Sequence, residues 1–444
     1  MKDHRLGWWG LLILNALFLV TAWTWQNIIP FNRAPDEFEH VHFNVEVILD
    51  QHRLPVSGVD DLAAYAATTT QSWGRVVSRY SYCIYPGFNY LLSAATAALA
   101  RDLWDWPVWR GARLASLGWG LVFLNALALA LRRVTGGRWV PALAATAATA
   151  LIPQVVFLAS YTNADIHSLA ASALLALALL NVWRQPQRSA LRWLGLAIGL
   201  VLVAKYNYFI LLPATPLLLL ALGRRDHWPV RRMASALVQV ALVAGLFSGG
   251  WYLRNLILYD DLLGQGFALR LMHRYAEPRD PLPITWSNLW LLVQLNFHGQ
   301  TFESLLGRFD YMTLRMPGLA YRAAEVVLGA AGLSGLIVLL LRRDNAAVRW
   351  LTALGTLICA SLALHVYNSM VNDFQPQGRY LFPVLVPCAL YSGWLASRHP
   401  ALLRALTLVA LLMLGLLLVA HLTLSGAYPN FAPVVGYLRN MGMT

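Results

Sequence analysis

The densest group of ionisable residues lies at positions 33–42, which read Arg-Ala-Pro-Asp-Glu-Phe-Glu-His-Val-His. Three carboxylates and two imidazoles fall within seven of these residues, directly after an apolar run from 6 to 29. Ionisable groups where a membrane helix ends are energetically costly unless they have a partner or a function. We therefore interpret this segment as part of a site, with four candidates: Asp36, Glu37, Glu39 and His40.

Pro35 favours the first turn of a helix, and acids suit the positive end of the helix dipole. Phe38, Val41, Val45 and Ile48 fit a helical stripe, which predicts an amphipathic helix on the outer membrane face. Ordinary helix capping is the alternative explanation for the acids. One acid is enough for a cap, however, and here there are three together with two histidines.

A second acid, Asp165, ends the polar segment 160–165 at the expected outer mouth of a later membrane helix. It is either another cap or a site residue. Beside Asp36 it would give a pair of acids suited to proton transfer or to holding a divalent cation such as Mg²⁺ or Mn²⁺. Acid pairs also work without a metal, so the sequence does not require the divalent cation as a cofactor. It contains no zinc-protease, phosphate-loop or dinucleotide motif.

The candidate partners of an anionic substrate are cations expected on the outer face, against the usual charge bias of membrane loops. Lys205 is the only lysine after Lys2, and its compact ammonium suits a phosphate. Arginine forks also match phosphate oxygens. Ordinary ion pairing with nearby acids is the alternative for each arginine. The arginines in question are Arg254, Arg308 and Arg379.

Composition identifies a membrane protein: of 444 residues 58% are hydrophobic and only 12% are charged, about half the charged share of a soluble domain. The net charge of +13 comes from short arginine clusters between apolar runs, as positive-inside topology requires. This distribution excludes a nucleic-acid-binding face and leaves membrane lipids as the general surroundings. The three cysteines have no metal-site spacing.

Placing all basic clusters inside predicts one all-α polytopic domain over 1–444 with about eleven membrane helices and outer-face helices beside the membrane. Residues 190–222 are expected to form two short helices that turn at 205–208, and 139–158 a single crossing. The apolar run 86–100 is short for a span and is expected not to cross. The outer segments are then 30–108, 252–318 and 365–379, and the carboxyl tail also lies outside.

Seven short motifs, by their residues and their order along the chain, resemble those of the GT-C superfamily of membrane glycosyltransferases. The resemblance is greatest to the aminoarabinose- and protein-mannosyltransferase types. The resemblance covers roughly 30–385 and is specific for the superfamily rather than for a substrate. The motifs are Pro35-Asp36-Glu37 with His40, Tyr85-Pro86-Gly87-Phe88-Asn89-Tyr90-Leu91, Arg113-Leu114-Ala115-Ser116, Tyr161-Thr162-Asn163-Ala164-Asp165, Ala204-Lys205-Tyr206, Trp251-Tyr252-Leu253-Arg254-Asn255 and Gln377-Gly378-Arg379-Tyr380.

The resemblance implies a polyprenyl-phosphate-linked sugar donor, Asp36 as catalytic base and Asp165 as the matching second-loop acid. It implies a glycan, lipid or protein acceptor on the periplasmic side of a bacterial inner membrane. Tyr85 and Tyr380 join the candidates through their motifs, although a basic residue and a second proline are expected around Tyr85. Two alternatives stay open. A lipid-glycan flippase would bind the same groups without reaction, but no inverted repeat is evident. A polysaccharide ligase or polymerase would transfer a polymer.

Overall fold

The computed structural model of the chain describes residues 2–62, 71–72, 75–76, 82–275, 282–342, 345–371 and 374–429. Parts of the expected outer segments, at 63–70, 73–74, 77–81, 276–281 and 372–373, lie outside the described residues, as does the chain after 429.

The first half of the structure is almost entirely helical. Its elements are α1 (Lys2–Ile28), α2 (Glu37–His40), the π-helical turn η1 (Val41–Val45), α3 (Glu46–Gln51), β1 (Gln71–Ser72), β2 (Arg75–Val76), the 3₁₀ turn η2 (Tyr82–Ile84), α5 (Phe88–Trp104), α6 (Val108–Val134), α7 (Trp139–Ala150), α8 (Pro153–Leu158), α9 (Asp165–Arg184) and α10 (Arg188–Leu202).

The second half continues in the same way, with one more short antiparallel strand pair. Its elements are the 3₁₀ helix η3 (Tyr206–Leu211), α11 (Ala214–Arg225), α12 (Val230–Tyr259), α13 (Gln265–Tyr275), α14 (Trp286–Gln294), α15 (Phe297–Leu306), β3 (Arg308–Phe309), β4 (Leu314–Arg315), α16 (Gly318–Arg342), α17 (Asn345–Val371), the 3₁₀ helix η4 (Gly378–Val384), α18 (Leu385–Arg398) and α19 (Pro400–Ala427).

The protein is an all-α polytopic membrane protein, as predicted. Within the described residues, nine helical segments are long and apolar enough to cross a membrane. The other two of the eleven predicted crossings correspond to shorter elements, α10 and α7 followed by α8. The single helix expected over 139–158 is broken between Ala150 and Pro153. A residue before proline is driven out of the helical region, and Ile152 indeed has ψ 124°.

One end of the bundle collects the basic clusters. Arg184 donates to the Arg133 carbonyl at 2.6 Å, Arg225 to the Trp183 carbonyl at 2.7 Å, and Arg138 to the Ser397 carbonyl. The amino-terminal helix joins the same end, since the Trp8 and Trp139 rings lie 5.0 Å apart. On the α16–α17 side, Tyr391 donates to the Ala347 carbonyl. These contacts agree with the assignment of all basic clusters to one membrane side.

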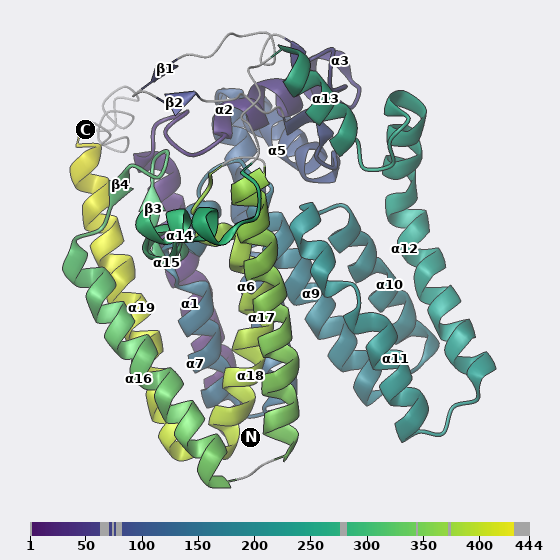
Figure 1. The fold of residues 1–444 in the computed structure, drawn as a ribbon, viewed down its shortest axis with the longest axis vertical. Coiled ribbons are helices and arrows are strands. Elements are labelled where there is room, and N and C mark those ends of the chain that lie inside the picture. Colours follow the sequence, from purple (N-terminus) through teal and green to yellow (C-terminus); the bar gives the residue numbers. More distant parts are fainter. Residues whose placement is uncertain are drawn as a thin grey trace.

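The opposite end carries α2, α3, α5 and α13, which lie together above the long helices (Figure 1). Residues 37–51 form one continuous helix through α2, η1 and α3, which confirms the predicted helix after Pro35. Val41 and Val45 of its stripe are buried, whereas Phe38 is exposed. The run 86–100 corresponds to the 17-residue α5 (Phe88–Trp104), and its expected failure to cross the membrane remains a prediction.

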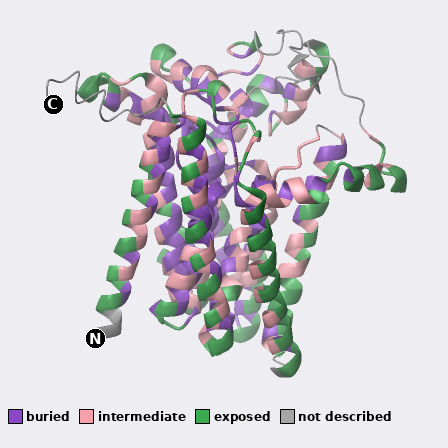
Figure 2. Cartoon of the chain, turned by 90° about the vertical axis from the view of Figure 1, so that its left-hand side faces the viewer, coloured by how far each residue is buried: buried purple, intermediate pink, exposed green. Residues whose placement is uncertain are grey.

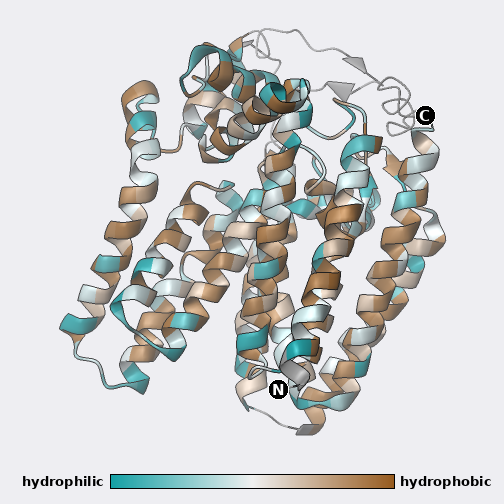
Figure 3. Cartoon of the chain, turned by 180° about the vertical axis from the view of Figure 1, so that it is seen from behind, coloured by the Kyte–Doolittle hydropathy of each residue, from teal (hydrophilic) through white to brown (hydrophobic). Residues whose placement is uncertain are grey.

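The long helices differ in how much of their surface the protein itself covers. The apolar windows of α6 and α9 are 67% buried, whereas those of α16 and α17 are 11% buried. Exposed and half-buried residues predominate on the peripheral helices (Figure 2). Hydrophobic residues fill the middle of the long helices, and hydrophilic residues gather toward their ends (Figure 3). Helices α6 and α9 are therefore the centre of the bundle, and α16 and α17 present apolar faces suited to lipid.

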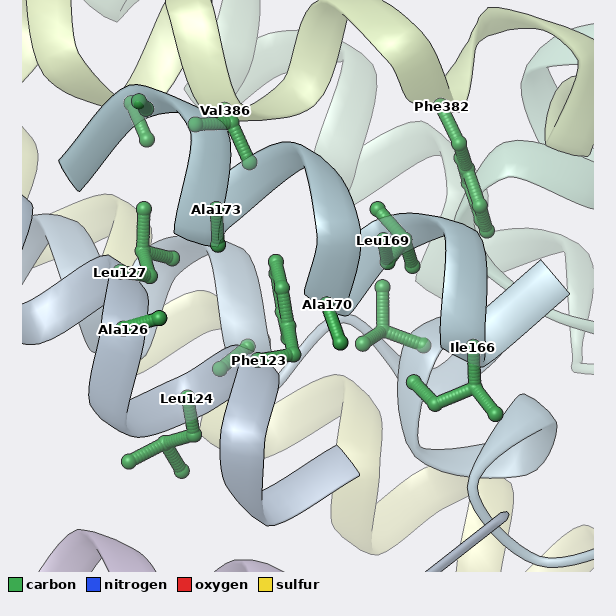
Figure 4. Packing of buried hydrophobic residues seen from close by; sticks show 14 of the residues in the cluster. Phe123, Leu124, Ala126, Leu127, Ile166, Leu169, Ala170, Ala173, Phe382 and Val386 are labelled. Carbon is green, nitrogen blue, oxygen red and sulfur yellow. The ribbon is translucent and has the colours of Figure 1, made fainter. Parts of the chain in front are cut away.

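The central core fixes the positions of α9 and η4, two elements that carry charged residues. Phe123 and Leu127 of α6 pack against Leu169 and Ala170 of α9, and Phe382 of η4 joins them (Figure 4). All of these side chains are fully buried. Because buried cores are close-packed, the first turn of α9 and the η4 turn are held rigidly with respect to each other.

We predict that Asp102 and Asp226, both exposed, lie on opposite membrane sides. In a cysteine-free background, Asp102→Cys should react with an impermeant maleimide added to intact cells, whereas Asp226→Cys should react only after permeabilisation. Labelling of both positions from outside would show that the chain crosses the membrane an even number of times between them, against the predicted five. Labelling of Asp226→Cys alone would show that 86–100 crosses the membrane or that the whole orientation is reversed.

Candidate active site

Four charged side chains from four distant parts of the sequence meet at the end of the bundle opposite the basic clusters. Arg379 Nη2 lies 3.2 Å from Asp36 Oδ2, and Arg379 Nη1 lies 3.5 Å from Asp165 Oδ2. Lys205 Nζ lies 2.9 and 3.0 Å from the two Asp165 oxygens. The charges alternate along this chain, which we call the charge network: Asp36, Arg379, Asp165 and Lys205. Its formal charge is zero, so it can persist beside apolar helices.

Asp36 is the most accessible member of the charge network, with a quarter of its side chain (26%) exposed. It precedes α2 in a left-handed conformation, φ 62° and ψ 9°, and its side chain caps no backbone amide of that helix. A non-glycine residue in this region is strained, and such strain gathers at functional sites. The capping explanation for Asp36 therefore fails on geometry.

The Asp36 carboxyl is held in its ionised form by its neighbours. Burial by itself would raise its pKa, but Arg379 and a hydrogen bond from Tyr82 oppose this, and the pKa lies below its usual value. Lys205 acts in the same direction. An ionised carboxylate with exposed surface is the form that can accept a proton.

Asp165 is the first residue of α9 and is almost completely buried. Asn163, and not Asp165, caps the helix, because its Oδ1 accepts from the amides of Asp165 and Ile166 at 2.9 and 3.1 Å. The Asp165 carboxylate is thereby left for Lys205 and Arg379. The helix dipole adds to the stabilisation of this acid.

Lys205 reaches the charge network from the turn between two short helices, α10 and η3, where the sequence predicted such a turn. Its backbone amide donates to Ser168 Oγ at 3.0 Å, which ties the turn to the first turns of α9. Its ammonium lies 5.9 Å from the centre of the Tyr85 ring. This buried lysine therefore points inward to Asp165 and does not extend toward solvent.

Glu37 differs from its neighbour Asp36 in being fully buried and fully paired. Arg113 of α6 forms a bidentate pair with it, with two 2.7 Å hydrogen bonds, and also donates to the Gln26 and Ile29 carbonyls at the end of α1. Glu37 further accepts from the Thr162 amide at 3.3 Å. This geometry gives Glu37 a positioning role and does not support the catalytic role expected from the sequence.

An aromatic wall borders the charge network on the first-loop side. His40 Nδ1 lies 2.6 Å from the Tyr90 hydroxyl, and its ring lies 4.4 Å from that of Tyr82. Tyr85 stacks between Tyr82 and Tyr206, with ring centres 5.1 and 6.2 Å away. Burial lowers the His40 pKa to about 3, so the imidazole is neutral at physiological pH. Two candidates, His40 and Tyr85, thus lie next to the charged residues.

The remaining candidates lie at different distances from the charge network. Tyr380 directly follows Arg379, and its ring centre is 6.0 Å from that guanidinium. Glu39 is half-buried, and its carbonyl accepts from Asn44. Arg254 instead binds the Pro55 carbonyl, and Arg308 lies 3.7 Å from Glu303. These two arginines contact no member of the charge network in the described structure, so the geometry does not support their expected role in phosphate binding.

The acid pair gives no support to a divalent cation. Both carboxylates are already paired with cations, and among the described residues no group of three or more His, Cys, Asp or Glu side chains could hold a metal ion.

Three important residues were not recognised as site residues from the sequence: Tyr82, Arg113 and Asn163. An arginine inside an otherwise apolar helix was a usable signal for Arg113, because a buried cation needs an acid partner. Asn163 two residues before an acid was a weaker signal of a cap. Tyr82 had no signal beyond its place in an aromatic segment.

A family profile described as "Predicted membrane protein (DUF2142)" matches residues 60–387 of the chain. No curated protein matches the chain. Among solved structures, ArnT from Cupriavidus metallidurans is similar, with 15% identity, a TM-score of 0.40, and 92% of this chain and 78% of that chain covered.

The Archaeoglobus fulgidus oligosaccharyltransferase, solved with Zn and sulfate, is similar with 16% identity and a TM-score of 0.46. The match covers 94% of this chain and only 53% of that chain. The likeness predicted from the sequence motifs is thus found among solved structures as well.

We predict that breaking the buried Glu37–Arg113 pair strongly destabilises the protein, because it leaves an uncompensated buried charge. Arg113→Ala and Glu37→Gln should each lower the free energy of unfolding by about 3–5 kcal/mol. The exposed Arg101–Asp102 pair is the control, since Arg101→Ala should cost about 0–1 kcal/mol. Thermal unfolding of detergent-purified protein measures both effects.

The double variant Glu37→Met/Arg113→Met separates loss of charge balance from loss of packing. It should recover part of the lost stability, because an apolar pair leaves no buried charge, while the Gln26 and Ile29 carbonyls and the Thr162 amide lose their partners. Single variants as stable as the parent protein would contradict the positioning role of Glu37.

Proposed function

We propose that this chain, which belongs to the DUF2142 family of predicted membrane proteins, is a glycosyltransferase. In this proposal it is one integral membrane domain that moves a sugar from a polyprenyl-phosphate donor to a glycan, lipid or protein acceptor. The observation that carries the proposal is the charge network, in which a partly exposed, ionised Asp36 lies against Arg379 at the end of an apolar bundle.

Transfer of a sugar needs a base for the acceptor and cations for the leaving group. The acceptor hydroxyl oxygen forms a bond with the anomeric carbon while the bond from that carbon to the phosphate oxygen breaks. The hydroxyl proton passes to the Asp36 carboxylate, and the electron pair leaves with the polyprenyl phosphate. Asp36 is therefore the proposed base.

Arg379 is the proposed first contact of the leaving phosphate. Two of its guanidinium nitrogens already contact Asp36 and Asp165, and its Nε is buried without a hydrogen-bond partner. A buried unsatisfied N–H is rare and favours an acceptor such as a phosphate oxygen. Lys205 holds Asp165 and adds positive charge beside the same position.

The location of the charge network supports a reaction on the outer membrane face. It lies at the end opposite the arginine clusters, and such clusters mark the cytoplasmic side. A lipid-linked donor reaches this position from within the bilayer, so the protein needs no nucleotide-binding fold. In a bacterial cell this corresponds to the periplasmic side of the inner membrane.

Reconstituted protein with a radiolabelled polyprenyl-phosphate sugar distinguishes the proposed enzyme from its alternatives. Release of label onto an acceptor as single sugars supports the glycosyltransferase. Movement of intact donor across the vesicle membrane would instead identify a flippase. Transfer of a long polymer, detected from the product mass, would identify a ligase or polymerase.

We predict that Asp36→Asn lowers the transfer rate about 100- to 10,000-fold, the usual effect of removing a general base. The amide has nearly the shape of the carboxylate but cannot accept the proton. Arg315→Ala, at an exposed position on the same side of the protein, should keep the parental rate. Full activity of Asp36→Asn in membrane assays would move the base to another residue.

The pH dependence follows from the lowered Asp36 pKa. A base must be ionised, so activity is present above its pKa and is lost as the pH falls through it. We expect the acidic limb of kcat/KM to lie below the ordinary aspartate value, roughly pH 3.9. Arg379→Ala should move the limb upward, because it removes the strongest interaction that lowers this pKa. A parental limb near pH 6 would contradict this assignment.

A further inference from the structure

A cavity of about 290 Å³ lies between η3, α17 and η4. Tyr206 and Asn207 of η3, Ser361 and His365 of α17, and Tyr380 of η4 contribute to its lining. Tyr206 and Tyr380 directly follow Lys205 and Arg379 in the sequence. A group bound in the cavity would therefore contact residues that are adjacent in sequence to the two proposed phosphate-binding cations.

Three polar atoms of lining residues are buried without any hydrogen-bond partner. They are Asn207 Oδ1, Ser361 Oγ and His365 Nδ1. Ser361 and His365 are only 4% and 2% exposed. Such groups are rare in native proteins, and each needs an explanation. Their concentration around one cavity indicates a polar ligand that supplies the missing bonds.

The chemistry of these atoms specifies what the ligand must offer. His365 Nε2 lies 2.8 Å from the Gln375 carbonyl, which can only accept. In the neutral imidazole the proton is therefore on Nε2, and Nδ1 is an acceptor. Asn207 Oδ1 is also an acceptor, and Ser361 can take either role. The ligand must therefore donate hydrogen bonds, as hydroxyl groups do.

The lining also excludes a charged ligand group and favours a ring. None of the eight lining residues is Asp, Glu, Lys or Arg, so the lining itself supplies no counter-charge to a buried carboxylate or ammonium. The acceptor atoms would repel an anion directly. Aromatic rings supply the flat surfaces, since Tyr380 stacks on His365 with centres 5.2 Å apart and Tyr206 also lines the cavity.

We propose that this cavity binds an uncharged, polyhydroxylated sugar ring. Its hydroxyl groups would donate to Asn207 and His365, and its apolar face would lie on the tyrosine rings. Resting on the proposed function, we assign this ring to the lipid-linked donor, whose phosphate then lies at Arg379 and Lys205. The substrate class is thus a neutral hexose-type sugar, and acidic and amino sugars are excluded.

Binding to the full chain in nanodiscs tests the proposal. The probe is a radiolabelled polyprenyl-phosphate hexose, competed with polyprenyl phosphate alone, with the corresponding uronic-acid and amino-sugar lipids, and with free hexose. We expect the neutral-hexose lipid to bind more tightly than polyprenyl phosphate alone or the two charged-sugar lipids. Free hexose should not compete, because the phosphate contact is missing.

Two variants localise the sugar. Ser361→Ala and Asn207→Ala should each weaken binding of the hexose lipid, by about tenfold for one lost hydrogen bond. Binding of polyprenyl phosphate alone should not change. Thr356→Ala, at an exposed position of α17, is the matched control. Equal losses for the lipid with and without sugar would overturn the proposal, because the variants would then act on the fold or on the phosphate.

The other outcomes separate this proposal from the proposed function. Preferred binding of the uronic-acid or amino-sugar lipid would overturn the neutral-sugar assignment even if transfer occurs. Competition by free hexose at the affinity of the lipid would overturn the donor assignment. The expected binding pattern without any transfer would support the cavity as a neutral-sugar site while refuting the glycosyltransferase.

Discussion

The structure depends on mutual compensation of charge at the edge of an apolar bundle. Two acids and two cations lie at the point where the helices meet the first loop, and each charge faces one of opposite sign. Removing any one of them would leave an unbalanced charge in a poorly solvated place. The same constraint explains the buried Glu37–Arg113 pair, which joins α1, α2 and α6 behind the charge network.

In this arrangement neighbouring residues have different structural roles. Glu37 is fully enclosed and fixes the first loop, so Asp36 can remain partly exposed in a strained conformation. Asn163 caps α9, so Asp165 need not. Ser168 fixes the turn that carries Lys205. The reactive side chains are thus held by residues that are themselves fully bonded, which is how a site keeps its geometry without a rigid cover.

Much of the fold could be predicted because apolar runs and arginine clusters follow strong physical rules for membranes. The helix after Pro35, the turn at Lys205 and the shared end of positions 36, 165, 205 and 379 all followed from them. The same rules do not predict which partners the charged side chains bind. Hydropathy does not tell which of two adjacent acids, Asp36 and Glu37, turns inward, nor that Arg254 binds a carbonyl of the first loop. Those outcomes depend on three-dimensional packing.

The central claim is that Arg379 receives the phosphate of a lipid-linked sugar beside Asp36. Cryo-electron microscopy of the protein in nanodiscs with a polyprenyl-phosphate hexose measures this most directly. The account predicts phosphate density within hydrogen-bond distance of Arg379 Nε, with the anomeric carbon on the side of the Asp36 carboxylate. Phosphate density at Arg254, at Arg308 or at the arginine-rich end, with Arg379 still paired only to the two aspartates, would contradict it.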